Sequence, residues 1–320
     1  MKAARIHVLG ELPVLEEIEE PPRGPGQALF APKAVPLNPI DIATAAGRFY
    51  GGSPPTPYTP GSEGIARVLE GESLAEGTRV YIAGDGLGRK RDGTLAERAV
   101  AAEEIALPLP DEISDDLAGS CGTAGLAGWL PVVWRAETKP DDCVLVLGGT
   151  GTAGLAAVQA ARLIGARVVA AGRRPEGLER ASQRGADATV RLDEEDLPGA
   201  FREACGGDGP TVVIDPLWGK PLVAALEAAA RGARIVQIGQ SAGPIAEIPS
   251  ALVRGKQLEI LGYSNLDVPD DVRRNAYLEL VGHAAGGDIS FPIETYPLER
   301  MAEAWQRQAE GPGAKLIVTV

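Results

Sequence analysis

The sequence predicts an α/β chain of two domains, in which an irregular β domain precedes a doubly wound parallel sheet. Its 320 residues are too many for one ordinary hydrophobic core and suit two domains. Up to about residue 110, short β-like runs are broken by Gly and Pro, whereas later apolar runs alternate with helical segments. We therefore expect a β domain over residues 1–112, completed by residues 288–320, and a second domain over residues 113–287.

The first domain is expected to be mostly antiparallel. Its β-like runs cover residues 3–8, 27–36, 65–70, 79–83 and 95–101. Residues 51–60 contain four prolines, which remove hydrogen-bond donors and fix φ, so this segment is expected to be a surface loop. Ser114 and several acidic residues precede an Ala/Leu-rich run, which predicts a capped helix over residues 111–119.

The second domain shows strands and helices in alternation. Strands are expected at residues 144–147, 167–171, 188–192, 211–214, 234–238 and 258–261, and helices at 152–164, 176–184 and 221–230. Continuous apolar strands separated by helices predict a parallel sheet covered on both faces. Further helices, to about residue 285 and over residues 298–308, lead to a final strand at 315–320, and this tail is expected to return to the first domain.

Charge and cysteine content limit the partners and the compartment. The net charge of −13 opposes binding to nucleic acid or to an anionic membrane. The three cysteines lack CxxC spacing, which predicts neither a disulfide framework nor structural zinc. The start of the chain does not have the pattern of a signal peptide, and no apolar run has the length of a membrane span. A cytoplasmic protein is expected.

A glycine-rich turn is the strongest local signal. A G-x-G-x-x-G pattern formed by Gly149, Gly151 and Gly154 lies between an apolar strand and an Ala-rich helix. The first glycine permits the tight turn, the second lets the backbone approach a pyrophosphate, and the third allows close packing of helix on strand. The pattern predicts a Rossmann dinucleotide site whose cofactor contacts are Gly149, Thr150, Gly151, Thr152 and Ala153. The alternative is a strand-to-helix loop without a ligand.

The end of the second strand indicates which dinucleotide is bound. NAD-specific sites place an acidic residue there to bind the ribose 2′-hydroxyl. Here Gly172 is followed by Arg173 and Arg174, whose guanidinium groups suit a 2′-phosphate. NADPH is therefore favoured over NADH. The alternative is that the two arginines are simply a solvated charge pair.

Four further segments resemble a known family. Residues 35–41 (VPLNPID), 57–64 (PYTPGSEG), 122–129 (GTAGLAGW) and 313–318 (GAKLIV), together with the glycine-rich turn, resemble the medium-chain dehydrogenase/reductase superfamily and are most similar to its zinc-independent quinone oxidoreductase branch. The resemblance implies a GroES-like first domain and a nicotinamide ring presented to an electron-poor substrate. Zinc-dependent relatives usually have His where this chain has Ser62, and His7 and His283 lie far from every motif. Catalytic zinc is not expected, so the acceptor must take hydride readily, as quinones and α,β-unsaturated carbonyls do.

The resemblance also implies site residues. Asn38 and Asp41 match an Asn-x-x-Asp near the nicotinamide, although a helix N-cap with an acidic first turn explains them equally well. Tyr50 is a candidate proton donor or stacking residue, and shaping of its loop is the alternative. Thr123 matches a family position near the cofactor, and a hydroxyl at a helix start is the alternative. Residues at the ends of the later strands are expected to line the nicotinamide pocket, namely Asp215, Gly239, Gln240, Ser241 and Ser264.

These observations predict an NADPH-dependent reductase that transfers hydride to a quinone or an α,β-unsaturated carbonyl without zinc. Two alternatives remain, an enoyl-thioester reductase, for which Tyr50 is the discriminating residue, and a noncatalytic NADPH-binding or scaffold protein. A homodimer is expected through the edge strand at residues 256–262.

Overall fold

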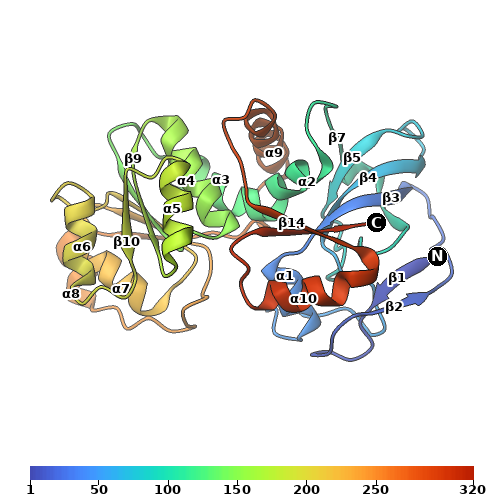
Figure 1. Cartoon of the computed structure of the whole chain (residues 1–320), viewed down its shortest axis with the longest axis horizontal. Helices are drawn as coiled ribbons and strands as arrows, with labels where there is room; N and C mark the ends of the chain where they lie inside the picture. Colours follow the sequence, from blue (N-terminus) through green and yellow to red (C-terminus); the bar gives the residue numbers. More distant parts are fainter. The chain divides into compact units, whose positions relative to one another are not determined.

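The structure, a computed structural model, describes all residues from 1 to 320 and consists of two compact units (Figure 1). Unit 1 comprises Met1–Thr123 and Pro292–Val320, and unit 2 comprises Ala124–Phe291. The divisions expected from the sequence lay at residues 112 and 287. Helix α2 (Asp115–Ser120) falls in unit 1 because it packs against strands of that unit's sheet. None of the helices has both the length and the apolar character needed to cross a membrane.

Unit 1 is built on a mostly antiparallel sheet. Its strands lie in the order β14 (Ile293–Pro297), β15 (Lys315–Thr319), β3 (Gln27–Pro36), β4 (Glu63–Glu70), β5 (Arg79–Ala83) and β7 (Ala106–Pro108), and β6 (Ala99–Ala102) also pairs with β3. Strands β1 (Lys2–Arg5) and β2 (Val14–Glu17) form a separate ribbon. Strand β14 pairs in parallel with β15, and β15 pairs antiparallel with β3. The C-terminal tail therefore supplies two strands to the first unit's sheet.

Strand β3 separates two hydrophobic clusters in unit 1. Val35 packs with residues of α1 (Pro39–Ala45), of β15 and of α10 (Met301–Ala309). Phe30 packs instead with Val68 and Val80 of the neighbouring strands β4 and β5. The pairing of β3 with β4 is irregular between Pro32 and Ala34, and the strand contributes to a different cluster before and after that point.

Unit 2 contains six parallel strands. Their order is β10 (Ala188–Arg191), β9 (Arg167–Gly172), β8 (Cys143–Leu147), β11 (Val212–Asp215), β12 (Arg234–Gln237) and β13 (Glu259–Gly262). The chain order reverses between β8 and β11. In open sheets of this kind, ligands bind outside the carboxyl ends of the strands at such a reversal.

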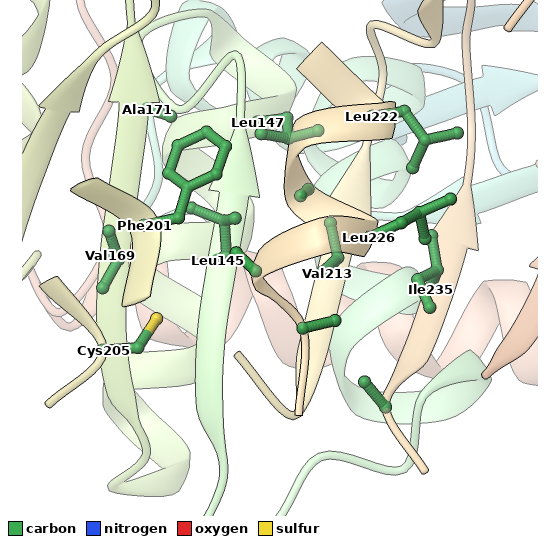
Figure 2. Close-up of a cluster of buried hydrophobic side chains, with 14 of the residues drawn as sticks. Leu145, Leu147, Val169, Ala171, Phe201, Cys205, Val213, Leu222, Leu226 and Ile235 are labelled. Atoms are coloured by element: carbon green, nitrogen blue, oxygen red, sulfur yellow. The ribbon is translucent and has the colours of Figure 1, made fainter. Parts of the chain in front are cut away.

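Helices cover both faces of the unit 2 sheet, as the sequence predicted. Figure 2 shows one face, where Leu145, Leu147 and Val213 lie against Phe201 of α6 (Leu197–Ala204) and Leu222 of α7 (Gly219–Ala228). The residues between them in the strands are buried as well and point to the other face, which α4 (Thr152–Ile164) contacts. The remaining helices are α5 (Pro175–Gln183), α8 (Ser250–Lys256) and α9 (Asp270–Ala285).

Two features were not predicted from the sequence. Helices α6 and α8 are short, at eight and seven residues, and α6 starts after Asp196, whose side chain accepts a hydrogen bond from the N–H of Gly199. The segment from Cys121 to Arg135 alternates between π-helical turns (η2, Cys121–Gly125, and η3, Pro131–Arg135) and the short helix α3 (Leu126–Leu130). Gly122 interrupts it with a ψ of −135°.

Candidate functional site

The glycines of the glycine-rich turn in unit 2 differ in how closely other atoms surround them. A Cβ on Gly154 would lie 2.2 Å from the carbonyl oxygen of Gly148, and one on Gly149 would lie 2.9 Å from the Cβ of Ala170. Both positions therefore need glycine for internal packing. A Cβ on Gly151 would meet nothing nearer than 3.9 Å. Gly151 thus leaves open space at the start of α4, where unbonded N–H groups of the first turn favour an anion.

The second strand-to-helix turn lies beside the first. A Cβ on Gly172 would lie 2.4 Å from the Cγ2 of Thr150, and one on Gly177 would lie 2.7 Å from the Cβ of Thr150. Arg173 and Arg174 are exposed directly after this contact, and Arg174 is the N-cap of α5. The structure therefore brings the two predicted arginines next to the turn, while Thr150, Thr152 and Ala153 are half-buried within it.

The end of strand β11 carries a strained turn. Asp215 is buried, and its Oδ1 accepts hydrogen bonds from the N–H groups of Leu217 and Trp218, both at 2.9 Å. Its Oδ2 is buried without a partner, and burial raises the pKa of Asp215 to about 6. Trp218 has a φ of +59°, a conformation unusual for a bulky side chain. Sequence reasoning missed Trp218, since no pattern in the sequence marks a positive φ at a tryptophan.

The end of strand β12 packs against the same turn. A Cβ on Gly239 would lie 2.8 Å from the carbonyl oxygen of Pro216, and the hydroxyl of Ser241 donates to that oxygen at 3.1 Å. Gln240 is exposed beside them. Ser264 follows strand β13, and its hydroxyl oxygen accepts from the N–H of Leu266 at 3.2 Å. The structure therefore brings Asp215, Gly239 and Ser241 together at the carboxyl ends of adjacent strands.

Asn38 and Asp41 form the start of helix α1 in unit 1. Asn38 is the N-cap, and Asp41 Oδ2 accepts from its backbone N–H at 2.8 Å. Asp41 Oδ1 accepts from the backbone N–H of Ser62 at 3.0 Å. Both residues are buried, and burial raises the pKa of Asp41 to about 6. The capping interpretation of these two residues thus describes their local structure.

Glu63 lies at the centre of a buried network in the same unit. Its Oε1 accepts from Nδ2 of Asn38 at 2.7 Å. Its Oε2 accepts from the hydroxyl of Tyr81 at 2.6 Å and from both the N–H and the hydroxyl of Thr123, at 2.7 Å and 2.9 Å. Glu63 has no exposed surface. A carboxylate removed from water requires such partners.

Lys315 supplies the cation of this network. Its Nζ donates to the carbonyl oxygen of Leu37 at 2.8 Å and to Oδ1 of Asn38 at 2.6 Å, and it lies 4.0 Å from Oε1 of Glu63. Burial lowers the pKa of Lys315, while Glu63 and Asp41 oppose that shift. We call Asn38, Asp41, Glu63, Tyr81, Thr123 and Lys315 the buried polar network. The sequence did not single out Glu63, Tyr81 or Lys315 as site residues, although a lysine at the start of the apolar run at residues 315–320 is a usable signal.

Tyr50 has a different environment from the network. Its side chain is 82% exposed, and its ring lies 4.5 Å from that of Phe49. The structure therefore places the proposed proton donor on an exposed loop of unit 1, whereas Asn38 and Asp41 are enclosed.

Comparison with known proteins identifies both units. Residues 24–111 match the alcohol dehydrogenase GroES-like domain, and residues 153–281 match the zinc-binding dehydrogenase family. Quinone oxidoreductase-like protein 2 of Mus musculus is 31% identical over 257 residues, which cover 78% of this chain and 70% of that relative. The chain belongs to the medium-chain dehydrogenase/reductase superfamily, in its quinone oxidoreductase-like branch. The predicted family and fold class, a GroES-like β domain with a doubly wound Rossmann domain, are confirmed.

Solved structures of this superfamily match over the full length. The quinone oxidoreductase of Thermus thermophilus, determined also in complex with NADPH, has a TM-score of 0.79 and 27% identity, and all of both chains is covered. An NAD-dependent alcohol dehydrogenase has a TM-score of 0.89 and 27% identity with the same coverage. This protein is therefore an oxidoreductase of the superfamily, and its neighbours support a nicotinamide cofactor.

The residues present do not fit zinc, despite the name of the second matched family. No group of three or more His, Cys, Asp or Glu side chains is arranged to hold a metal ion. Ser62 stands at the position where, by the resemblance, zinc-dependent relatives have His, and its buried hydroxyl has no partner. Burial raises the pKa of Cys121 to about 12, so this thiol is not a ready thiolate ligand. His7 and His283 pair instead with Glu16 and Asp288.

Substitution of Gly151 and of Gly154 should have different effects, because only Gly154 is closely surrounded by other atoms. Gly151→Ala adds a Cβ into open space, so the free energy of unfolding should change by less than about 1 kcal/mol, while affinity for a nicotinamide dinucleotide falls about tenfold or more. Gly154→Ala is the contrasting variant, because its Cβ would clash with Gly148 and stability should fall. Urea unfolding and calorimetric titration measure the two quantities. Full affinity in Gly151→Ala would show that no phosphate approaches this residue.

Proposed function

We propose that this protein is an NADPH-dependent reductase that transfers hydride to a quinone or an α,β-unsaturated carbonyl without zinc. The observation that carries the proposal is the open turn at Gly151 beside Arg173 and Arg174, with no carboxylate at the end of strand β9. The branch to which the chain belongs supports the acceptor class.

The chain's own residues have separable roles in this proposal. The N–H groups at the start of α4 bind the pyrophosphate, and Asp215 fixes the turn that packs against Gly239 and Ser241. The bound nicotinamide supplies the hydride. Rate enhancement comes from positioning and from exclusion of water, because the donor set for a zinc Lewis acid is missing. The acceptor must therefore delocalise the incoming charge onto its own oxygen, and solvent or Tyr50 supplies the proton.

The choice of NADPH rests on the arginines. The solved neighbours divide between NADPH for the Thermus thermophilus quinone oxidoreductase and NAD for an alcohol dehydrogenase of equal identity. An exposed guanidinium pair at the adenosine end makes charge-assisted hydrogen bonds to a 2′-phosphate, whereas a carboxylate there would repel it. That chemistry favours the phosphorylated cofactor.

Removal of the arginines should change cofactor preference. Arg173→Ala/Arg174→Ala loses two guanidinium groups, so NADPH should bind about 10- to 100-fold more weakly, while NADH affinity changes less than about threefold. Titration with both dinucleotides measures the ratio. Arg231→Ala, which removes an exposed arginine elsewhere in unit 2, is the control and should leave the ratio unchanged. An unaltered NADPH-to-NADH ratio in the double variant would refute the assignment.

Steady-state oxidation of NADPH tests the reaction itself. We expect turnover with quinones or with simple enones and slower turnover with enoyl thioesters. With an enoyl thioester as acceptor, Tyr50→Phe tests the second enzymatic alternative, because that reduction would need a donor tyrosine and its loss should lower kcat about 100-fold, whereas solvent can protonate a reduced quinone. Tight NADPH binding without turnover of any acceptor would instead establish the noncatalytic binding or scaffold function.

We also infer that two copies of this chain associate through strand β13. This strand is an edge of the unit 2 sheet that pairs with another strand, β12, on one side only, and its Ile260 is 39% exposed. Trp134 is 38% exposed, and its ring lies 6.4 Å from that of Tyr263, which directly follows the strand.

A charge at this edge should prevent dimerisation. Ile260→Glu buries an unpaired carboxylate in a dimer formed there, so light scattering should give the monomer mass, while wild type gives the dimer mass. Leu278→Glu is the matched control, since Leu278 is similarly exposed but lies on α9, and it should remain dimeric. A monomeric wild type, or a dimeric Ile260→Glu, would contradict the inference.

A further inference from the structure

Two of the three cysteines form a pair in the core of unit 2. Cys143 is the first residue of strand β8, and Cys205 is the C-cap of helix α6. Both belong to one hydrophobic cluster, and Figure 2 shows Cys205 on the sheet face that α6 covers. All three cysteines are free, so the pair is in its dithiol form. Neither thiol belongs to the glycine-rich turn or to the buried polar network.

Arg167 brings the two cysteines to one place. It is the register partner of Cys143 across the parallel strands β8 and β9. Its Nε and Nη2 donate to the carbonyl oxygen of Ala204 at 3.0 Å and 2.8 Å, and Ala204 directly precedes Cys205. The strand register and the bonds of this one arginine therefore bring the end of α6 to the start of β8. At this junction the side chains of Cys143 and Cys205 are hydrogen-bonded to each other.

The surroundings make the two thiols unequal. The hydrogen bond from Cys205, together with the charge of Arg167, lowers the pKa of Cys143, whereas burial and the carboxylates of Asp187 and Asp142 oppose that shift. The same hydrogen bond and burial raise the pKa of Cys205. The thiolate is the nucleophilic form of cysteine. Cys143 is therefore the reactive member of the pair, and Cys205 holds the proton.

The turn that follows α6 leaves open space beside the pair. Gly206 and Gly207 are exposed, with φ values of +86° and +105°. A Cβ on either residue would meet nothing within 4 Å. Cys205 itself is 7% exposed and Cys143 8%. A molecule as small as hydrogen peroxide therefore needs only a small opening at this glycine turn, and not the unfolding of a strand, to reach the sulfur atoms.

We propose that Cys143 and Cys205 are an oxidisable dithiol, which a hydroperoxide converts to a disulfide between the start of β8 and the end of α6. The link is reversible, because a small thiol can reduce it again by thiol–disulfide exchange. The proposal concerns unit 2 alone and does not depend on cofactor binding or on the proposed reaction.

The reaction proceeds in two steps. The thiolate of Cys143 attacks one oxygen of the hydroperoxide, so that an S–O bond forms, the O–O bond breaks, and the leaving oxygen takes up a proton. The sulfur of Cys205 then attacks the sulfur of Cys143, so that the S–S bond forms and the S–O bond breaks. The departing hydroxide takes the proton of Cys205 and leaves as water. The two sulfurs lose two electrons in total, and the peroxide gains them.

Thiol titration of the full-length protein tests the proposal. Reduced wild type should show three thiols in denaturant and retain one after treatment with hydrogen peroxide, because the disulfide consumes two. Mass spectrometry should find a peptide that joins Cys143 to Cys205 with the loss of two hydrogen atoms. Dithiothreitol should restore all three thiols. Cys121 is the internal control, since burial raises its pKa to about 12 and it should stay reduced.

Serine variants test the roles of the two thiols. In Cys205→Ser no disulfide can form between these positions, so Cys143 should stop at the sulfenic acid, which dimedone captures. In Cys143→Ser the remaining thiol of Cys205 should be labelled at least about tenfold more slowly, because its pKa is raised. The serine hydroxyl can replace the thiol as a hydrogen-bonding group in both variants.

The charge of Arg167 should affect the rate of oxidation and not its final extent. Arg167→Gln removes the guanidinium group, so disulfide formation at neutral pH should slow about three- to tenfold. Arg202→Gln is the matched control and should react as wild type does. Arg202 is an exposed arginine of α6 whose guanidinium group donates to the carbonyl oxygen of Glu227.

The proposal has clear contrary results. Retention of three thiols by peroxide-treated wild type would overturn it, and so would a bridge that contains Cys121 or joins two chains. Equal dimedone labelling of the two serine variants would refute the assignment of Cys143 as the attacking thiol. Should a serine variant fail to fold, the thiol count and the linked peptide of wild type decide whether the dithiol exists, and Arg167→Gln tests the role of Cys143.

Discussion

The buried carboxylate of Glu63 is the constraint that organises unit 1. An ion without water must be surrounded by donors, and four segments distant in sequence supply them or the balancing charge: the start of α1, strand β5, the segment at Thr123 and strand β15. Gly122 is required for the same reason, since a larger residue would occupy the carboxylate's place. One charge thereby adds polar links between these elements, of which α1 and β15 also share the apolar cluster of Val35.

Unit 2 depends on close approach of backbone rather than on charge. Gly154 lets α4 meet the turn after β8, and Gly128 lets α3 meet α4, where a Cβ would lie 1.9 Å from the carbonyl oxygen of Ala153. Such contacts leave no freedom in the position of the turn. The backbone around the open space at Gly151 is therefore rigid, as a phosphate-binding site requires.

The sequence predicted the repeating elements well because apolar strands and amphipathic helices leave a periodic pattern. Strands β3 and β5 and helix α4 have the expected bounds. Helices α6 and α8 are too short for their period to stand out. The glycine motif and the arginines were visible because their spacing is local. The pairing of Glu63 with Lys315 joins residues on strands far apart in the chain, and no local pattern encodes such a meeting.

The return of the tail to unit 1 also sets an order of events during synthesis. Strands β14 and β15, and with them the ammonium group of Lys315, leave the ribosome only after all of unit 2 has been made. Until then Glu63 lacks its counterion, Lys315, and β3 lacks its partner strand β15. All residues of unit 2 have been made by that point. Unit 2 is thus the first able to complete its core, and unit 1 must remain open until strands β14 and β15 have been made.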